Sequence, residues 1–220
     1  MSGNKLRAAD GQISLTYEKA FWLFICASIA GVIIEGLYSL IQRGRWESHV
    51  VSVFGAFNTL YGTGAVIFYI GSALMQRHHV LIRTAVLTAA ATVLELISGI
   101  ILRDRLGMEA WDYHSNFMNY RGLICLGFTL SWGAAAFLFT IFSHRIDMLL
   151  CRLKGPAWRI SCILMSIFMA LNILLTSAVI ARWSSRHHGY AAGNAGSRII
   201  DRAAPDEWMS SRFMEWRFII

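Results

Sequence analysis

Charged residues are scarce in this chain of 220 residues, where they make up 15% of the sequence against 56% for hydrophobic residues. The mean hydropathy is +0.50, and a soluble core of this size cannot bury so much apolar sequence. The apolar residues also gather in runs of roughly 20, the length that crosses about 30 Å of hydrocarbon as a helix. The composition therefore excludes an ordinary soluble domain and predicts a multi-pass protein of the cell membrane, with the lipid bilayer as its main partner.

Several signatures of metal binding and catalysis are also absent. The four cysteines (Cys26, Cys125, Cys151 and Cys162) include no C-x-x-C pair, so neither a disulfide framework nor a zinc site is predicted. No G-x-x-x-x-G-K-[ST] phosphate loop occurs, so the chain is not itself a P-loop ATPase, and no G-x-S-x-G or H-E-x-x-H motif indicates a hydrolase. We expect no cofactor and no bound metal, and an enzyme is the less favoured class.

The net charge of +7 comes from Lys and Arg that lie mainly between the apolar runs and in the C-terminal tail. Anionic lipid headgroups are the expected counterions, and no nucleic acid is expected as a partner. The basic residues are nearly balanced between the two sides of the membrane, so the positive-inside rule does not decide the orientation. A cytoplasmic N-terminus is the expectation. The first apolar run contains Glu35 and has no small-residue cleavage site after it, so we expect it to stay in the mature protein.

Five apolar runs are long enough to span the bilayer, at residues 20–41, 50–75, 84–102, 122–142 and 160–181. They predict an all-α, polytopic integral membrane protein with about five transmembrane helices. A cytoplasmic segment, 1–19, precedes this domain and residues 182–220 follow it. The second, fourth and fifth runs hold no charged residue, whereas the first and third hold one each, Glu35 and Glu95.

The C-terminal tail divides into two parts. Residues 189–204 are rich in Gly and Ala and are typical of a flexible linker. Beyond them, Met209, Phe213, Trp216 and Ile220 recur at helical spacing between charged residues, which predicts a helix lying on the membrane surface. The alternative is a disordered tail with an apolar end.

The first and third apolar runs follow the same pattern around their glutamates. Each glutamate is followed by arginines eight and ten residues later and then by a loop containing tryptophan (Arg43, Arg45 and Trp46; Arg103, Arg105 and Trp111). We interpret this as a two-helix unit used twice. Because each unit crosses the membrane twice, the copies point the same way, and both glutamates lie about 9 to 10 Å inside the same face. Coincidence is the alternative, since basic residues flank most spans.

Glu35 and Glu95 are the best candidates for a functional site. An ionised carboxylate in hydrocarbon costs on the order of 2.5 to 3.5 kcal/mol, so such residues normally face protein or water. Small residues share the helix face of each glutamate (Ala27 and Gly31; Ala91 and Gly99), so both side chains are expected to point into the bundle. The functional hypothesis is a site for a cation, a proton or a polar substrate. The structural alternative is a bond to a neighbouring helix or to Arg43, Arg45, Arg103 or Arg105.

Two further groups of polar residues are candidates for the same site. Asn58 and Tyr61 interrupt the second apolar run, either as part of a polar pathway or as hydrogen bonds between helices. The loop before the fourth run is dense in aromatic and hydrogen-bonding groups: Trp111, Asp112 and Tyr113, then Asn119 and Arg121. This loop is expected to cap the carboxylate site, the alternative being a belt of aromatic residues at headgroup level.

Several groups of residues carry a resemblance to a known family. They are Gly31-Val-Ile-Ile-Glu35; Gly55 with Leu60-Tyr61-Gly62-Thr63-Gly64; Thr92-Val-Leu-Glu95; and Trp111-Asp112-Tyr113 with Asn119-Tyr-Arg-Gly122-Leu-Ile-Cys125-Leu and Ser131-Trp132-Gly133. On these residues the chain resembles the bacterial membrane family labelled "putative ABC transporter permease" (ABC transporter type IV, CmpB-like), over about residues 18 to 143. The resemblance implies a transporter-type membrane subunit.

The chain departs from that family's usual pattern at two places. An Asn-Arg-Gly-like turn is replaced by Trp46-Glu47-Ser48-His49, and Gly-Pro and Pro-Ile-Tyr-Gly patterns are replaced by Gly55-Ala56 and Thr59-Leu60-Tyr61-Gly62. Both prolines are therefore missing. If they shape a break in the second span, that span is expected to be straighter in this chain.

The leading hypothesis is a transporter permease subunit with an intramembrane acidic site, working with a separate ATPase if ATP drives it. The candidate protein partners are therefore such an ATPase and a second copy of the chain. One alternative is a membrane-embedded enzyme that acts on a lipid or lipid-linked substrate, with a glutamate and Asp112 as acid and base. Another is a regulatory or scaffolding membrane protein.

Overall fold

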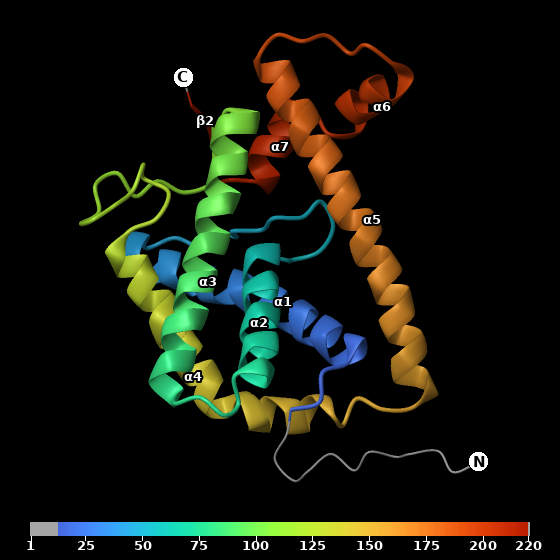
Figure 1. Ribbon diagram of the computed structural model, residues 1–220. Helices are drawn as coiled ribbons and strands as arrows, with labels where there is room; N and C mark the ends of the chain where they lie inside the picture. Colours follow the sequence, from blue (N-terminus) through green and yellow to red (C-terminus); the bar gives the residue numbers. More distant parts are fainter. Residues whose placement is uncertain (1–12, 220) are drawn as a thin grey trace.

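A computed structural model describes residues 13–219 of the chain, and these residues form a helical bundle with a folded C-terminal tail (Figure 1). The bundle helices are α1 (Tyr17–Arg43), α2 (Thr59–Leu74), α3 (Val80–Ile100), α4 (Leu126–Leu150) and α5 (Pro156–His187). A π-helix, η1 (Ile101–Arg105), extends α3. The tail holds α6 (Ala195–Ala203) and α7 (Asp206–Arg212), and two short strands pair, β1 (Met108–Glu109) with β2 (Arg217–Phe218).

Four of these helices are long and apolar enough to cross a membrane: α1, α3 with its π-helical extension, α4 and α5. Their outer faces carry large apolar side chains in contact with the surroundings; Leu164, Leu171 and Leu174 on α5 are all more than 60% exposed. Such a surface is compatible with lipid and not with water. The prediction of an all-α, multi-pass membrane protein is therefore confirmed.

The second predicted span differs from the structure. Residues 50–75 were expected to form one helix, but α2 begins only at Thr59, and its 16 residues are fewer than the roughly 20 that a full crossing needs. Residues 50–58 contain no helix. The absence of the two prolines therefore does not make the second span one straight, continuous helix.

Side chains of α5 satisfy the backbone of this non-helical segment. The Asn172 side chain accepts a hydrogen bond from the Phe54 N–H (3.1 Å) and donates one to the Phe54 carbonyl (2.9 Å). The Thr176 hydroxyl accepts from the Val53 N–H at 2.9 Å. Non-helical backbone at membrane depth is tolerated only where protein provides such partners, and α5 provides them here.

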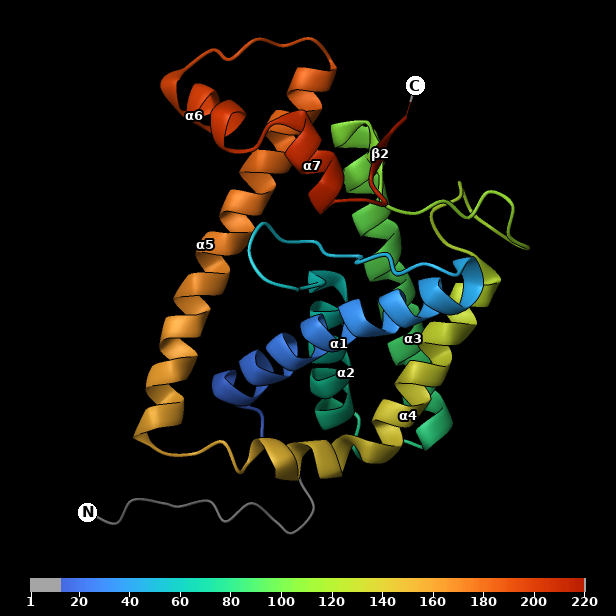
Figure 2. The same ribbon diagram turned by 180° about the vertical axis from the view of Figure 1, so that it is seen from behind.

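The bundle is arranged as two close helix pairs, with α5 at one edge. Figures 1 and 2 show α1 running obliquely across α2 and α3, while α5 lies on the opposite side of α2 from α4. In the first pair, a Cβ atom added at Gly31 of α1 would come within 2.5 Å of the Tyr61 ring on α2, so glycine is needed for the close approach. In the second pair, Ala91 of α3 is completely buried.

A buried ion pair joins three helices at the end of the bundle opposite the tail. The Lys19 Nζ of α1 lies 2.7 Å from the Asp147 carboxylate of α4, and the Tyr69 hydroxyl of α2 donates to the same oxygen at 2.5 Å. Ser14 accepts two further hydrogen bonds from Lys19. Asp147 was not identified from the sequence, because its partners lie 78 and 128 residues away.

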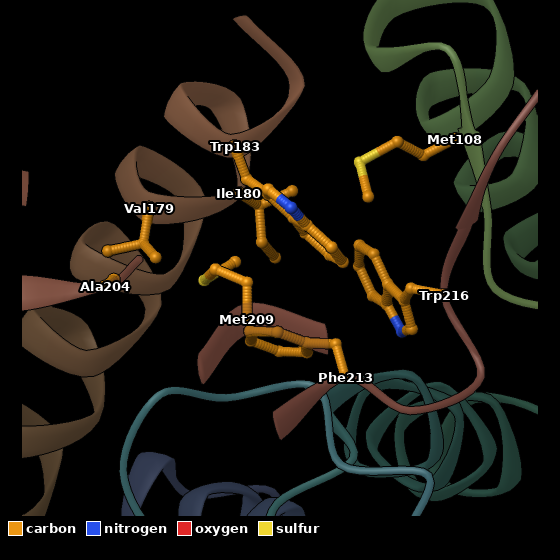
Figure 3. Packing of buried hydrophobic residues seen from close by; sticks show 8 residues of the cluster. All are labelled: Met108, Val179, Ile180, Trp183, Ala204, Met209, Phe213 and Trp216. Carbon is orange, nitrogen blue, oxygen red and sulfur yellow. The ribbon is translucent and has the colours of Figure 1, made fainter. Parts of the chain in front are cut away.

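The tail folds back onto the bundle, which the sequence did not predict. Part of the expected linker forms α6, and Met209, Phe213 and Trp216 point inward toward Trp183 of α5 and Met108 (Figure 3). Met209 and Phe213 are completely buried. These side chains therefore form a core of their own in place of the expected membrane-surface helix, while Ile220 lies outside the described residues.

Ion pairs hold α6 against the end of α5. Arg182 and Arg186 both bind the Asp201 carboxylate, at 2.8 and 2.7 Å, and Arg186 also binds Asp206 at 2.7 Å. The hydrogen bond from Arg182, aided by Arg186, lowers the pKa of Asp201 to about 2. The ionised carboxylate is thus favoured by the folded tail.

We predict that loss of the Asp201 charge releases α6. Because its pKa in the folded chain lies below the ordinary value of 3.8, this contribution to tail stability is complete above about pH 4 and is lost as the pH falls toward 2. Asp201→Asn should mimic that loss at pH 7 and speed tryptic cleavage after Arg198 and Arg202 severalfold. Pepsin should cut α6 faster in Asp201→Asn than in the wild type at pH 4 and at nearly equal rates in the two at pH 2, because the wild-type charge is then also lost. Glu207→Gln is the control, and equal cleavage rates in both variants would contradict the prediction.

Candidate intramembrane acidic site

The first carboxylate of the site comes from α1 and is held by α2. Glu35 is half-buried, and the Tyr61 hydroxyl, in the first turn of α2, donates a hydrogen bond to its Oε1. Tyr61 reaches this position because Gly31, one turn before Glu35, leaves space for its ring. In this contact Glu35 points toward a neighbouring helix beside a small residue, as the sequence analysis expects.

The second carboxylate comes from α3 and is more enclosed. Glu95 is 4% exposed; its Oε1 accepts from the Tyr113 hydroxyl at 3.0 Å and its Oε2 from the Trp132 indole N–H at 3.1 Å. Tyr113 belongs to the loop before α4, and Trp132 to α4 itself. Burial and the nearby Glu95 carboxylate raise the pKa of Tyr113, so the phenol stays neutral and remains a donor.

The partners of the two carboxylates touch each other. The ring of Tyr61, which binds Glu35, lies against the indole of Trp132, which binds Glu95, with a centroid distance of 5.5 Å. Tyr113 in turn stacks on Phe128 of α4 at 4.4 Å. The contact between the Tyr61 and Trp132 rings therefore connects Glu35 with Glu95, and the two carboxylates belong to one site.

The donors at this site are all neutral. No basic side chain among the described residues forms an ion pair with Glu35 or Glu95. The four arginines that were considered as structural partners lie elsewhere: Arg43 and Arg45 bind Glu47, Arg103 binds Glu109, and Arg105 forms no ion pair with a described residue. The acidic site thus differs from the Asp147 cluster, where Lys19 supplies the counter-charge.

Two loops of matching sequence lie above the site. Trp46-Glu47-Ser48-His49 follows α1 and Trp111-Asp112-Tyr113-His114 follows η1, a W-[ED]-x-H match that the sequence reading overlooked. Each tryptophan packs against a glycine close to one of the glutamates. Trp46 lies against Gly36, the residue after Glu35, and Trp111 lies against Gly99, one turn after Glu95. The two glycines stand one and four residues after their glutamates, so the contacts are alike but do not occupy equivalent positions of the proposed two-helix unit, whose duplication stays a prediction.

The loop before α4 is closed by its own polar groups. Asn119 donates to the His114 and Asn116 carbonyls, both at 3.0 Å, and accepts from the Gly122 N–H. Arg121 pairs with Asp104 at an exposed position, 2.9 Å away. Asn119 and Arg121 therefore shape the loop and do not reach the carboxylates, whereas Tyr113 does.

The remaining predicted site residues also have structural contacts. Asn58 is the N-cap of α2, accepting from the Leu60 N–H, and it donates to the His49 carbonyl, so it was wrongly placed inside a span. The Trp111 indole donates to the Leu123 carbonyl at 2.9 Å. Asp112 accepts from the His114 backbone N–H at 2.9 Å, and this bond, with the His114 side chain and Arg217, lowers the pKa of Asp112.

The C-terminal tail covers both loops. Glu215 accepts a hydrogen bond from the His49 N–H at 3.1 Å, and Arg217 binds Glu109 at 2.6 Å and Asp112 at 3.2 Å. Glu47, His49 and Glu215 place potential metal-ligand atoms within 4.8 Å of one another. Burial opposes ionisation of Glu47, but the hydrogen bond from Arg45 and the Arg43 charge lower its pKa. We interpret this cluster as an ion-pair network.

The fold and site together define a multi-pass membrane protein with two acidic side chains among its helices, Glu95 buried and Glu35 half-buried. A family model described as "Putative ABC-transporter type IV" matches residues 22–177, and the chain belongs to this family. The resemblance covered residues 18 to 143; the match begins at residue 22, extends further toward the C-terminus, to residue 177, and includes both glutamates, most of α5 and the intervening loops. A search of curated proteins and of solved structures finds no match.

We predict that the Trp132 N–H stabilises the bundle through Glu95. Trp132→Phe keeps an aromatic ring but removes a hydrogen bond to a buried acidic group, which should cost roughly 1.5 to 3 kcal/mol. Thermal unfolding of the purified protein in detergent measures the loss. Glu95→Met should abolish the effect of Trp132→Phe, because no acceptor is then left. Trp158→Phe, at the far end of α5, is the matched control; an equal loss in both tryptophan variants would refute the assignment.

Proposed function

We propose that this chain is the permease subunit of a transporter and that Glu35 and Glu95 bind a cation, a proton or a polar substrate with hydrogen-bond donors. The observation that carries the proposal is the charge balance of the site. Two carboxylates sit between membrane helices with neutral donors around them and no ion pair to a described basic residue. Buried charge of one sign is unfavourable, so a ligand that donates protons or carries positive charge stabilises it.

The chemistry of the partners suits reversible binding. An ionised carboxylate only accepts hydrogen bonds, while the Tyr61 and Tyr113 hydroxyls both donate and accept. A ligand that donates to Glu35 or Glu95 can replace a phenol, which can rotate away and bind the ligand from another side. An anionic ligand would meet repulsion from both carboxylates. The proposal therefore excludes simple anions as the species bound at the two glutamates.

Unpaired polar groups continue from the site into the bundle. The Ser28 hydroxyl, two turns from Glu35 on the same face of α1, and the Thr92 hydroxyl, one turn from Glu95 on α3, are buried without a hydrogen-bond partner among the described residues. Buried hydroxyls normally have partners. Their position supports a polar route for the ligand or for water between the two helix pairs.

In this proposal the energy comes from ATP, which a separate polypeptide hydrolyses. The chain has no phosphate-binding loop, and its family carries the description of an ABC transporter. A lipid-modifying enzyme is less well supported, because Asp112, the proposed acid or base, is bound by His114 and Arg217 and does not contact Glu95.

The functional test compares Glu35→Gln and Glu95→Gln. Glutamine keeps the size and one acceptor oxygen but removes the charge, so both variants should reach wild-type levels in the membrane and lose transport-dependent function at least tenfold. The measurements are the amount of membrane-inserted protein and the rescue of a strain that lacks the chain. Glu18→Gln, at the exposed start of α1, is the control. A fall in function that always parallels a fall in protein level would show that the carboxylates are structural.

Extraction of the complex tests the energy source. When the full chain is purified from its own membranes in a mild detergent, we expect a P-loop ATPase to be retained at a fixed ratio. The Glu95→Gln variant should retain the same ATPase, since the carboxylate is buried within the bundle. Repeated recovery of the chain without an ATPase would refute ATP as the energy source and would leave the acidic site to be judged by the first test.

A further inference from the structure

A cavity of about 370 Å³ lies between the end of α3 and one face of α5, away from the two glutamates. Its lining is mostly apolar, and its main residues are Ile101, Leu102 and Arg105 on the α3 side and Ile173, Ser177 and Ile180 on α5. The non-helical segment after α1 and Trp216 of the tail close it on other sides. Figure 1 shows α5 set apart from α3 along this part of the bundle.

The π-helix decides which arginine faces this cavity. Within Ile101–Arg105 the turns are wider than in an α-helix, and Arg105 lines the cavity together with Ile101. Arg103 is engaged by Glu109 at 2.9 Å, and Asp104 by Arg121. Arg105 alone of these three charged residues has neither an ion pair nor a hydrogen bond with a described residue. An uncompensated cation therefore remains at the cavity.

The polarity of the cavity changes along its length, toward the tail end of the bundle. Ile101, one turn deeper than Arg105, and Ile173, the deepest residue from α5, are 52% and 42% exposed. Arg105 lies at the tail end of the bundle, where long basic side chains reach headgroups. Trp216 of the tail lies in the same wall. Apolar surface below and a cation above match the two ends of a phospholipid.

Two of the three hydroxyl groups in the lining, those of Ser177 and Thr176, already have hydrogen-bond partners. Ser177 donates to the Ile173 carbonyl of its own helix at 2.9 Å, and Thr176 already accepts from the Val53 N–H. A polar solute would therefore meet few free side-chain groups apart from Arg105 and the Thr59 hydroxyl. An acyl chain can fill the apolar part without leaving any polar atom unpaired.

We propose that this cavity is a binding site for an anionic phospholipid of the surrounding bilayer, with one acyl chain between α3 and α5 and the headgroup phosphate on Arg105. The bound lipid fills the space between α5 and the first four helices and touches the non-helical segment that α5 holds. It therefore stabilises the placement of α5. This site is independent of the function proposed for Glu35 and Glu95.

The test uses the purified full chain after removal of lipid, with phosphatidylglycerol or phosphatidylcholine added back and bound lipids counted by native mass spectrometry. One phosphatidylglycerol should be retained in preference to phosphatidylcholine. Arg105→Gln should weaken its binding about fivefold, the factor that one basic residue contributes near an anionic lipid surface. Arg198→Gln, an exposed arginine of α6 outside the cavity, should bind as the wild type does.

A second variant tests the acyl-chain part of the site. Ser177→Phe fills the cavity from α5 and should displace the retained phosphatidylglycerol, whereas Leu174→Phe, on the outward face of the same helix, should not. Size-exclusion chromatography checks that each variant is folded. Three results would each overturn the proposal. The wild type retains no phosphatidylglycerol, Ser177→Phe and Leu174→Phe retain it equally, or a dimer forms across this face without lipid.

Discussion

The structure depends on one constraint: a carboxylate between membrane helices needs a hydrogen-bond donor or a counter-charge from another part of the protein, because lipid offers none. Asp147 forms an ion pair with Lys19 and accepts a hydrogen bond from Tyr69. Glu35 accepts one from Tyr61, and Glu95 accepts from Tyr113 and Trp132. Each of these contacts joins different elements. The same interactions therefore hold the bundle together and determine where its charges lie.

The two kinds of acidic cluster differ in a way that matters for function. At one end, Asp147 is neutralised by Lys19, which makes a structural connection between α1 and α4. Near the other end, Glu35 and Glu95 have neutral donors, with an aromatic contact between Tyr61 and Trp132. A neutralised pair gains little from a further ligand, whereas carboxylates without a counter-charge gain from a cation or a donor. This difference is the basis of our proposal that the second cluster binds a ligand, in a chain of the family described as "Putative ABC-transporter type IV".

The backbone obeys the same constraint as the side chains. Residues 50–58 are not helical, and Asn172 and Thr176 of α5 accept hydrogen bonds from the backbone N–H groups of Phe54 and Val53. At the tail, the arginines of α5 pair with Asp201, and Met209 and Phe213 become buried. The fifth helix thus supports two segments that lack regular membrane-spanning structure. The cavity beside Arg105 is lined by α5, the end of α3 and parts of these two attached segments.

The sequence alone determined that the chain is a helical membrane protein, that Glu35 and Glu95 are its exceptional residues, and that small residues turn them inward. These properties depend on run length and helical periodicity, which are local. Tertiary structure alone decided that Tyr61, Tyr113 and Trp132 are the partners, 26, 18 and 37 residues from their glutamates. It also decided that α2 starts at Thr59, that Asn119 and Arg121 only shape their loop, and that the tail is folded. Hydrophobicity specifies that a segment leaves water, but the partner of a buried polar group is specified only when distant segments pack together.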